Sequence, residues 1–434
     1  MWSVQSDSIN NFRYTDSLHN IPALKLVSKF ELFLRFLQNE NNINQMRYRL
    51  VRMTAGSMAL KVSTRGQPRY MSEHGFDVTM ISSDGWELPG VIALEGCPHI
   101  KVNLSRKLSP VADAISIYKL YRIFKKLKPH IIHSENLKAN LAGPIAGYFA
   151  GVPVRIQTMA GLVSPTKKGL KGWLIRQAEI LSFKFATDVW PNSHKSMEYM
   201  INTKMVSPKK TKVIGRGSTN GIDLERFNPN AIVPERLEEI KKTVDYKPGD
   251  SILVFAGRMV KDKGVEELVA AFERLQPQFP DLKLVLLGPQ EADLDPLKQS
   301  TIDAISKNER IVHIDWTDEV EYYLSIATLF VFPSYREGFP NVIMQAGAMK
   351  CPVVCSDIVG NNEIVTNGVN GVLHKSQDED AVYESVTFAL QNKEKMQQMA
   401  MKLYEDMHNY YDRYGLYELY IKEYIELVES RSKK

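Results

Sequence analysis

The strongest restriction on the fold is an alternation of short apolar runs with segments of helical period, which restarts half-way along the chain. Helical patterns at residues 59–74, 110–127, 139–150 and 169–186 separate several runs of the first series. Strand, helix and strand in this order predict right-handed crossovers and a mostly parallel sheet. The first series of apolar runs occupies residues 48–54, 77–82, 99–104, 130–134, 152–159, 188–191 and 212–214.

A second series of apolar runs follows a loop at residues 228–234 and a short charged helix. It occupies residues 251–256, 282–287, 311–314, 329–332 and 353–355. Runs that are almost continuously apolar are typical of strands buried on both faces. The chain therefore predicts an α/β protein with two Rossmann-like, doubly wound domains that face a central cleft. Ligands of such sheets bind beyond the carboxyl ends of the strands, so residues that follow strands carry the functional information.

The two series divide the chain into a domain of residues 46–228, a domain of residues 229–395 and a charged helical segment of residues 396–434. Tyrosines recur through that last segment, and we expect them to form a packing face. Residues 1–45 are rich in Asn and Ser and precede the first predicted strand. We hypothesise that Met46 is the native start of the chain; the alternative is a native arm that carries one amphipathic helix.

Composition excludes several classes of protein. Apolar residues make up 44% and charged residues 24% of the 434 residues, which is incompatible with disorder over most of the chain. The 3 cysteines are too few for a disulfide scaffold, and a net charge of +5 is too small for a dedicated nucleic-acid binder. Neither a signal peptide nor a membrane-spanning stretch is predicted, so we expect a cytoplasmic location.

A glycine-rich segment from Gly215 to Gly221 has the pattern of a dinucleotide-binding loop. Such a loop must open a helix whose N-terminus holds the pyrophosphate, but Pro229 follows too closely for a full crossover helix. An acidic residue at the end of a second strand is also missing. These departures disfavour a nicotinamide cofactor.

Two cations follow the strand predicted at residues 251–256. Gly257 lets the backbone turn at the strand end, and Arg258 and Lys263 then bring a guanidinium and an ammonium toward the cleft. A helix begins near Val265, and two such cations beside a helix N-terminus suit a diphosphate. The alternative is a solvated basic loop.

A carboxylate, that of Glu337, follows a later strand, and Gly338 after it allows a close approach of the backbone. Pro340 suits the first turn of a helix, whose amides can receive a phosphate or a sugar oxygen. Gln345, farther along the same helix, offers an amide to a polyol. The alternative, a capped core helix, does not explain the apolar Phe339, which we expect at an exposed turn.

Together, these two motifs resemble the donor-binding half of glycosyltransferase family 4, whose members retain anomeric configuration and have the two-domain GT-B fold. The family shows a Gly-Arg loop that ends in Lys, here Gly257 to Lys263, and an E-x7-E-type motif that often opens with Glu-Gly-Phe, here Glu337 to Phe339. The resemblance covers about residues 48–390 and is strongest to the branch that builds capsular polysaccharide, exopolysaccharide or O-antigen. It extends to segments at residues 133–138, 150–155, 217–223, 356–365 and 370–373.

The resemblance implies a role for each residue of these motifs. Arg258 and Lys263 bind the donor diphosphate, and Glu337 contacts the transferred sugar. The second Glu of the family motif, which holds the ribose hydroxyls, is replaced here by Gln345. A neutral acceptor contributes about 1 kcal/mol where a charged one contributes ~1.5–3 kcal/mol, so we expect donor binding to be weakened but not abolished. The backbone that contacts the sugar and phosphates belongs to Gly338, Phe339, Pro340, Asn341 and Val342.

A second departure from the family lies in the first domain. Many relatives carry a site histidine after the strand at residues 152–159, where this chain has Met159-Ala160-Gly161. His133 is the remaining histidine near a strand end, and it is either a catalytic residue or an imidazole whose hydrogen bonds are satisfied within the fold. The resemblance further implies no metal and no cofactor beyond a nucleotide-sugar co-substrate, with uracil as the base.

Basic residues gather in the first domain, where residues 101–128 hold eight Lys or Arg against a single acid. Basic amphipathic segments bind anionic lipid, so we expect this region to contact a membrane surface or a lipid-linked acceptor. The alternative is an ordinary solvated helix face. The residues expected to make this contact are Arg106, Lys107, Arg122, Lys125 and Lys126.

We therefore predict a metal-independent hexosyl- or N-acetylhexosaminyltransferase that moves a sugar from a nucleotide-sugar donor to a lipid-linked or saccharide acceptor in cell-surface polysaccharide biosynthesis. It would be peripheral at the inner membrane face. The alternative from another class is a catalytically weak, nucleotide-sugar-binding scaffold of a polysaccharide assembly complex. A nucleotide-sugar 2-epimerase shares the fold, but the acidic and histidine residues that it needs are not found.

Overall fold

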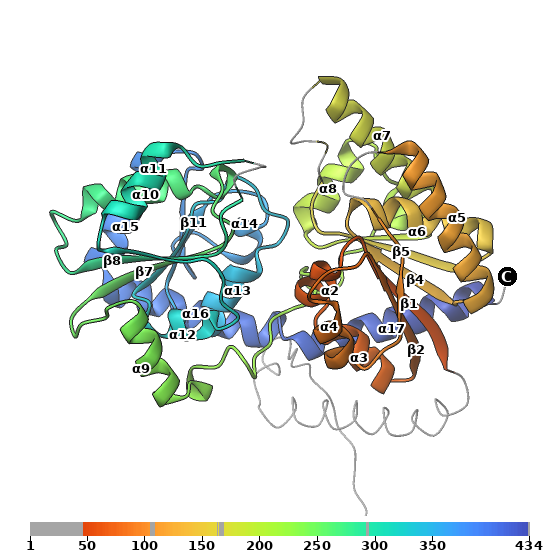
Figure 1. The fold of residues 1–434 in the computed structure, drawn as a ribbon, viewed down its shortest axis with the longest axis horizontal. Helices are drawn as coiled ribbons and strands as arrows, with labels where there is room; N and C mark the ends of the chain where they lie inside the picture. Colours follow the sequence, from red (N-terminus) through yellow and green to blue (C-terminus); the bar gives the residue numbers. More distant parts are fainter. Residues whose placement is uncertain (1–46, 105–108, 163, 165–168, 292–294, 433–434) are drawn as a thin grey trace, which may run out of the picture. The chain divides into compact units, whose positions relative to one another are not determined.

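The structure is a computed structural model, and it describes residues 47–104, 109–162, 164, 169–291 and 295–432 (Figure 1). Residues Tyr48–Lys434 form one compact unit, which contains both predicted sheets. The two hypotheses about residues 1–45 concern a part of the chain outside the described residues.

Six described strands form a first parallel sheet in the order β3-β2-β1-β4-β5-β6. The direction of sheet growth reverses between β1 and β4, which are paired in register from Leu50 with Ile131 to Thr54 with Glu135. The part of the chain built on this sheet is called the first half below. Its strands are β1 (Tyr48–Thr54), β2 (Phe76–Ser82), β3 (His99–Lys101), β4 (Ile131–Glu135), β5 (Val154–Met159) and β6 (Asp188–Pro191).

Helices cover both faces of the first sheet. Successive side chains of each strand therefore point into two different hydrophobic cores, one on each face. Leu50 of β1 packs in a core with Tyr417 and Tyr424 of the C-terminal helix, whereas Val51 packs in a second core with Leu120. The helices of this half are α2 (Ser57–Ser63), α3 (Gln67–Glu73), α4 (Leu88–Glu95), α5 (Pro110–Leu127), α6 (Leu137–Ala150), α7 (Gly169–Phe185) and α8 (His194–Asn202), followed by a 3-10 turn, η2 (Pro208–Lys210).

Six further strands within the described ranges form a second parallel sheet in the order β12-β11-β10-β7-β8-β9. Counted within each half, both sheets follow the order 3-2-1-4-5-6 of a doubly wound dinucleotide-binding fold, so the predicted fold class is confirmed. The part built on this sheet is called the second half. Its strands are β7 (Ser251–Ala256), β8 (Leu282–Leu287), β9 (Ile311–Ile314), β10 (Leu329–Phe332), β11 (Val353–Ser356) and β12 (Val372–His374).

The second sheet is buried on both faces in a single core, to which all its strands except β12 contribute fully buried or nearly buried side chains. This burial explains why the strands of the second half appear in the sequence as almost continuous apolar runs. The surrounding helices are α9 (Pro234–Thr243), α10 (Val265–Leu275), α11 (Gln299–Lys307), α12 (Val320–Ile326), α13 (Asn341–Ala348), α14 (Asn361–Ile364), α15 (Glu379–Gln391) and α16 (Lys393–Tyr410), with the 3-10 turns η3 (Pro229–Ala231) and η4 (Lys261–Lys263).

Several element predictions are wrong in detail. The helix expected at residues 59–74 is two helices, because Gly66 adopts a left-handed conformation with φ of 81° between α2 and α3. The run at 212–214 is not a strand; only Thr211 beside it bridges to Val189 of β6. Helices α4 and α8 and strand β12 were not predicted, since they are short and their apolar pattern is weak.

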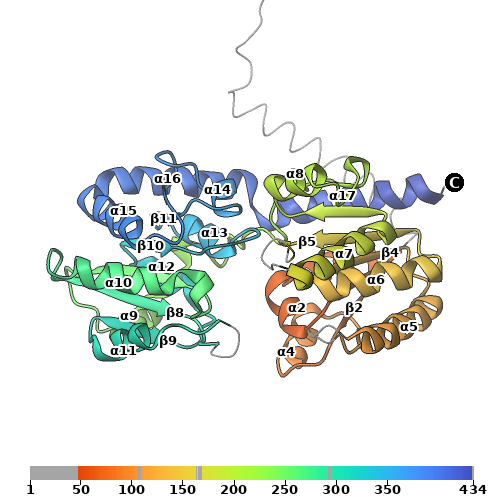
Figure 2. The same cartoon turned by 90° about the horizontal axis from the view of Figure 1, so that it is seen from above.

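The helical segment predicted at residues 396–434 is divided, in its described part, between α16 and α17 (Arg413–Ser432). Between them Tyr411 accepts a hydrogen bond from the backbone of Ile222, and Arg413 donates one back, which interrupts the helix. Helix α16 packs on α13 of the second half, whereas α17, in blue in Figures 1 and 2, lies along the first sheet. The expected tyrosine packing face is confirmed by Tyr417 and Tyr424, which are fully buried.

Candidate functional site

The two predicted motifs meet because β7 and β10 are neighbouring parallel strands, with Leu253 opposite Leu329. This is the position at which the order of the second sheet reverses, where open α/β sheets bind ligands. The loop after β7 carries Arg258 and Lys263, and the loop after β10 carries Glu337. The two loops pack tightly, since a Cβ on Gly264, whose φ is 71°, would lie 2.2 Å from the carbonyl oxygen of Pro333.

Lys263 and Glu337 are in direct contact: the Nζ of Lys263 lies 2.5 Å from Oε1 of Glu337. Ser334 donates a second hydrogen bond of 2.8 Å to the same carboxylate oxygen. The two charged side chains are 16% and 15% exposed, so they are largely shielded yet open to a ligand. The cation and the carboxylate predicted from separate motifs therefore act at one place.

Two further cations beside this pair are also in contact with carboxylates. Arg258 lies 2.7 Å from Glu291, and Arg336 lies 2.7 Å from Asp262. Asp295 supports the loop, because its carboxylate accepts a hydrogen bond of 2.8 Å from the backbone of Asp262. Each cation is therefore held near the carboxyl edge of the sheet by a partner that a stronger anion can replace.

A pocket of about 410 Å³ opens at these side chains and is lined by both halves of the molecule. We call it the cleft pocket. From the second half it contains Arg258, Lys263 and Glu337, as the sequence predicts. The other residues that line it are Ala160, Gly161, Leu162, Lys195, Ser196, Tyr199, Asp262, Arg336, Gly338 and Val359.

Gly338 is a point of close approach between the two halves. A Cβ on Gly338 would lie 1.8 Å from the carbonyl oxygen of Ala160, so no other residue fits without displacement. The close backbone approach that the sequence predicted for Gly338 is thus present, but it is made to the loop after β5.

The N-terminus of α8 is held by a carboxylate from the opposite half. Glu363 of α14 accepts hydrogen bonds from the backbone N–H groups of His194, at 3.2 Å, and Lys195, at 2.6 Å. A carboxylate is favourable there because the first amides of a helix are unpaired and carry partial positive charge. This contact orients the helix that supplies Lys195, Ser196 and Tyr199 to the cleft pocket.

The expectation for Phe339 is wrong. Its side chain is only 8% exposed and packs on Tyr411, with ring centroids 5.7 Å apart. Gly217 makes room for it, since a Cβ there would lie 2.9 Å from the Phe339 ring. The apolar residue at this turn therefore fills the core between the two halves.

The rest of the predicted donor segment begins helix α13. Pro340 is the residue before the helix, one position earlier than expected, and Asn341 and Val342 open it. Gly257 follows β7 as predicted. Gln345 is partly exposed in the second turn, and within the described chain neither it nor Gly257 is among the residues that line the cleft pocket.

The structure places His133 in the interior, which favours the alternative to a catalytic role. The side chain is fully buried, with Nδ1 2.5 Å from the Tyr424 hydroxyl and Nε2 2.6 Å from the Thr158 hydroxyl. Burial and the nearby Arg52 guanidinium hold the pKa of His133 well below its ordinary value. Its two hydrogen bonds make it the satisfied strand imidazole that was the alternative.

The predicted basic surface is only partly described. Arg106 and Lys107 lie outside the described residues, whereas Arg122, Lys125 and Lys126 are exposed on α5. No helix in the described part of the chain is long and apolar enough to cross a membrane. Among the same residues, no group of three or more His, Cys, Asp or Glu is arranged to hold a metal ion.

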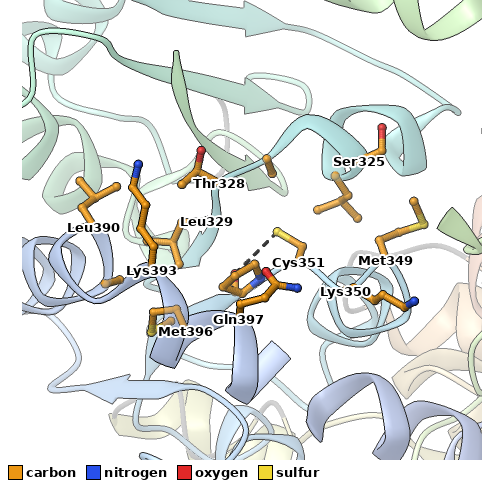
Figure 3. A pocket seen from close by; sticks show the side chains of 14 residues that line it. Ser325, Thr328, Leu329, Met349, Lys350, Cys351, Leu390, Lys393, Met396 and Gln397 are labelled. Atoms are coloured by element: carbon orange, nitrogen blue, oxygen red, sulfur yellow. Dashed lines mark hydrogen bonds between the residues drawn. The ribbon is translucent and has the colours of Figure 1, made fainter. Parts of the chain in front are cut away.

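A second cavity, of about 320 Å³, lies at the opposite edge of the second sheet (Figure 3). It is lined by Leu329, which begins β10, by Cys351 and Pro352 just before β11, and by Lys393 and Met396 of α16. Because these residues precede the strands, this cavity is separated from the motif side chains by the length of the sheet.

Sequence reasoning missed the contribution of α8. The loop after β5, by contrast, is where the family resemblance indicated a site residue, and Ala160 and Gly161 of this loop line the cleft pocket. The signal for α8 was weak: Ser193, whose side chain accepts a hydrogen bond from the backbone of Ser196, is a typical residue to precede a helix. Glu363 belongs to a segment that resembles the family, but its contact with α8 depends on how the two halves pack.

Comparison with known proteins supports one family throughout. Residues 60–217 match the model of the glycosyl transferase 4-like domain, and residues 237–406 match the model of glycosyl transferases group 1. The capsular polysaccharide biosynthesis glycosyltransferase CapM of Staphylococcus aureus is 31% identical over 323 residues, which cover 74% of this chain and 82% of CapM. An α-1,3-galactosyltransferase of Escherichia coli that uses UDP-Gal and α-D-GlcNAc-diphosphoundecaprenol is 28% identical over 70% of this chain and 78% of its own length.

Solved structures show the same fold at lower identity. A glycosyltransferase from Rickettsia africae superposes with a TM-score of 0.73 at 18% identity, covering 88% of this chain and 99% of its own. The Anabaena protein HepE, crystallised with UDP and glucose, superposes with a TM-score of 0.72 at 16% identity, covering 87% and 99%. The chain therefore belongs to glycosyltransferase family 4, is a glycosyltransferase, and has the GT-B fold of two doubly wound sheets.

Proposed function

We propose that this enzyme transfers a hexosyl or N-acetylhexosaminyl unit from a UDP-sugar, bound in the cleft pocket, to a lipid-diphosphate-linked acceptor. The observation that carries the proposal is the contact between Lys263 and Glu337 in a pocket lined by both halves. A cation and a carboxylate at neighbouring strand ends suit the two parts of such a donor, a diphosphate and a polyhydroxylated ring.

The proposal assigns the diphosphate to Arg258 and Lys263. Both cations now rest on carboxylates, Glu291 and Glu337, at 2.7 and 2.5 Å. A diphosphate carries more negative charge than a carboxylate, so it would replace Glu291 and Glu337 as the partner of these cations. Glu337, once released from Lys263, is free to accept hydrogen bonds from the hydroxyls of the sugar.

Transfer breaks the bond between the anomeric carbon and the diphosphate oxygen, and the acceptor hydroxyl oxygen forms the new bond to that carbon. The proton of the hydroxyl passes to the released phosphate. Negative charge grows on the diphosphate as it departs, so Arg258 and Lys263 stabilise the transition state more than the ground state. The family resemblance adds retention of anomeric configuration and independence of metal ions.

The backbone after Glu337 is assigned to the sugar and phosphates, and Gln345 to the ribose. The amides of Asn341 and Val342 open helix α13, where an anionic group is favoured. Gln345 keeps an acceptor oxygen in the second turn but lacks the charge that the family carries there. We therefore expect a weakened but functional nucleotide site.

The acceptor class is proposed from the relatives. The E. coli relative acts on an undecaprenol-linked sugar diphosphate, and a Campylobacter jejuni relative, 26% identical over 74% of this chain, acts on another. CapM is a glycosyltransferase of capsular polysaccharide biosynthesis. An acceptor of this kind is anchored in a bilayer, so the enzyme would work at the inner membrane face.

Three adjacent helices of the first half suit such a surface. Helix α6 contacts both α5 and α7, and all three leave large apolar side chains exposed. Arg122, Lys125 and Lys126 add positive charge on α5, and each cation near an anionic bilayer is worth about 1 kcal/mol. The exposed apolar side chains are Val111, Ile115 and Tyr118 on α5, Tyr148 and Phe149 on α6, and Leu170, Trp173, Leu174 and Leu181 on α7.

The test is release of UDP by the full chain, measured with a panel of UDP-sugars and short-chain sugar-diphosphate lipids. We expect Lys263→Ala to lower transfer at least ~100-fold, on the scale of one lost oxyanion donor. Lys261→Ala is the matched control, because Lys261 is an exposed lysine of the same loop that does not line the cleft pocket. Equal activity of the two variants contradicts the proposal.

A further inference from the structure

A second pocket lined by both halves lies at the carboxyl edges of the two sheets. It shares no lining residue with the cleft pocket. It has a volume of about 580 Å³ and is formed by α2 and α4, which follow β1 and β2, together with residues near the loop after β9. All three strands end at the carboxyl edges where α/β sheets bind ligands. We call it the tryptophan pocket; it is lined by Lys61, Arg65, Trp86, Glu87, Leu94 and Arg226, among others.

Two tryptophans from opposite halves lie beside one lysine here, and Trp86 is the one that lines the pocket. Trp86 of the first half is 77% exposed and Trp316 of the second half is 49% exposed. The Nζ of Lys61 lies 5.4 Å from the centroid of each ring. An indole as exposed as that of Trp86 leaves most of its apolar surface open to a ligand.

The loop that carries Trp86 is held rigidly from behind. Ser57 donates a hydrogen bond of 2.8 Å to the buried carboxylate of Glu87, and Ser83 donates one of 2.7 Å to the backbone of Ala55. A Cβ on Gly85 would lie 2.2 Å from the Ser57 hydroxyl, so a larger residue there would have to displace the side chains of Ser57 and Glu87. The indole is thereby preorganised, which lowers the entropy that a ligand loses on binding.

The charges around the tryptophan pocket are already balanced. Arg226 makes a double contact with Glu321, at 3.0 and 2.8 Å, and Lys61 lies 3.5 Å from Asp318. A neutral ligand leaves these ion pairs in place, whereas an anion would compete with the carboxylates for the cations. A neutral ligand with many hydroxyls can bond to the charged groups at the rim while its apolar face covers the indole of Trp86.

We propose that the tryptophan pocket binds the sugar unit of the acceptor, with Trp86 as the stacking platform for its ring. The inference rests on the proposed function, because a transfer reaction needs two substrates and the donor occupies the cleft pocket. A pyranose ring has an apolar C–H face and a hydroxyl edge, which match the indoles and the rim of ion pairs. The anionic part of the acceptor is left outside this pocket.

The test compares Trp86→Ala with Tyr410→Ala, using a short-chain sugar-diphosphate lipid in detergent. Tyr410 is the control because it is an aromatic side chain that is 44% exposed on α16 and lines neither pocket. We expect Trp86→Ala to raise the KM for the acceptor at least ~10-fold, which is the loss of one good aromatic contact. Trp86→Phe should restore most of it, and Tyr410→Ala should match the wild type.

Donor binding separates this inference from its alternatives. The affinity for UDP, measured by calorimetry, and the slow hydrolysis of the UDP-sugar by water should stay within twofold of the wild type in Trp86→Ala. An equal loss of UDP affinity would place the nucleotide base on Trp86, and an unchanged acceptor KM would leave the indole without a substrate role; either result overturns the inference. If the wild-type enzyme binds no UDP-sugar, the proposed function itself fails.

Discussion

The carboxylate of Glu363 in the second half accepts a hydrogen bond of 2.6 Å from the backbone N–H of Lys195 in the first half. The neighbouring amide of His194 donates to its other oxygen at 3.2 Å, so the carboxylate occupies the N-terminus of α8. Because α8 lines the cleft pocket, the same contact joins the two halves and positions one wall of the pocket. The first prediction follows from it.

Replacement of Glu363 by Ala should loosen the two halves and misplace α8. We expect kcat/KM to fall at least ~10-fold, since the loss of a charged helix cap costs about 1 kcal/mol or more and the pocket wall is displaced as well. Hydrogen exchange of the α8 amides should become faster. Asp378→Ala is the control, because Asp378 caps α15 within the second half; it should lower stability but leave kcat/KM within twofold.

Replacement of Arg258 by Lys should be less harmful than replacement by Ala, but still costly. Lysine keeps the charge but loses the planar fork that bonds two phosphate oxygens at once. We expect transfer to fall about tenfold in Arg258→Lys and at least ~100-fold in Arg258→Ala, measured as initial rates of UDP release. Identical rates in these two variants would show that only charge matters at this position.

Replacement of Gly338 by Ala should force the halves apart at the cleft pocket. The added Cβ would lie 1.8 Å from the Ala160 carbonyl oxygen, and overpacking of this kind costs about 1–3 kcal/mol. We expect weaker UDP binding in calorimetry and a lower unfolding temperature. Gly415→Ala is the control, because its Cβ meets the Asp412 carboxylate only at an ordinary 3.5 Å; a Gly338→Ala variant as stable as this control would contradict the close contact.

His133 should affect stability at acid pH and not turnover. Its folded-state pKa is held below the ordinary value of 6.5 by burial and by Arg52, so the unfolded chain binds the proton more readily. The stability that this imidazole contributes is therefore complete above about pH 6.5 and is lost as the pH falls, by up to about 1.4 kcal/mol per pH unit.

Urea unfolding of the wild type and of His133→Gln from pH 7.5 to 5.5 measures this effect. The wild type should lose more stability than the variant over the range, although other histidines such as His374 titrate in both proteins. Turnover of His133→Gln at pH 7.5 should stay within about threefold of the wild type, since the residue lies away from the cleft pocket. A loss of 100-fold would restore the catalytic interpretation.

The enzyme should bind vesicles of phosphatidylglycerol at low salt and leave them at high salt, as measured by flotation. Reversal of three charges on α5, by Arg122→Glu, Lys125→Glu and Lys126→Glu, should abolish this binding. The control reverses the exposed lysines Lys393, Lys395 and Lys402 of α16 in the second half, which should leave binding largely intact. Absence of wild-type binding at low salt contradicts the membrane surface.

Local sequence patterns predicted the two sheets and the positions of the loops that carry Arg258, Lys263 and Glu337. Strands β1, β6, β7, β8, β9 and β10 have the predicted bounds. In β7, β8 and β10 the run is buried almost throughout, which leaves little choice of register or period. Arg258, Lys263 and Glu337 could be placed together for the same reason: parallel neighbouring strands deliver their following residues to one edge.

Those local patterns could not predict contacts between residues that are far apart along the chain. Phe339 looked exposed because the burial of a turn depends on what packs over it, here Tyr411 and Gly217. From the sequence, His133 near a strand end could be a catalytic residue. In the fold, its imidazole is bonded to the hydroxyl of Tyr424, 291 residues farther along the chain. The break between α16 and α17 likewise depends on Ile222.

Period and spacing along this chain were enough to establish two wound sheets and the cations and carboxylate at their ends, because those features arise from local conformation and from the geometry of parallel strands. The packing of the halves supplied the rest: the wall that α8 forms, the hydrogen bonds that Glu363 accepts, and the placement of Trp86 and Trp316 beside Lys61. Such pairings join residues whose separation along the chain carries no periodic signal, so only the folded arrangement brings them together.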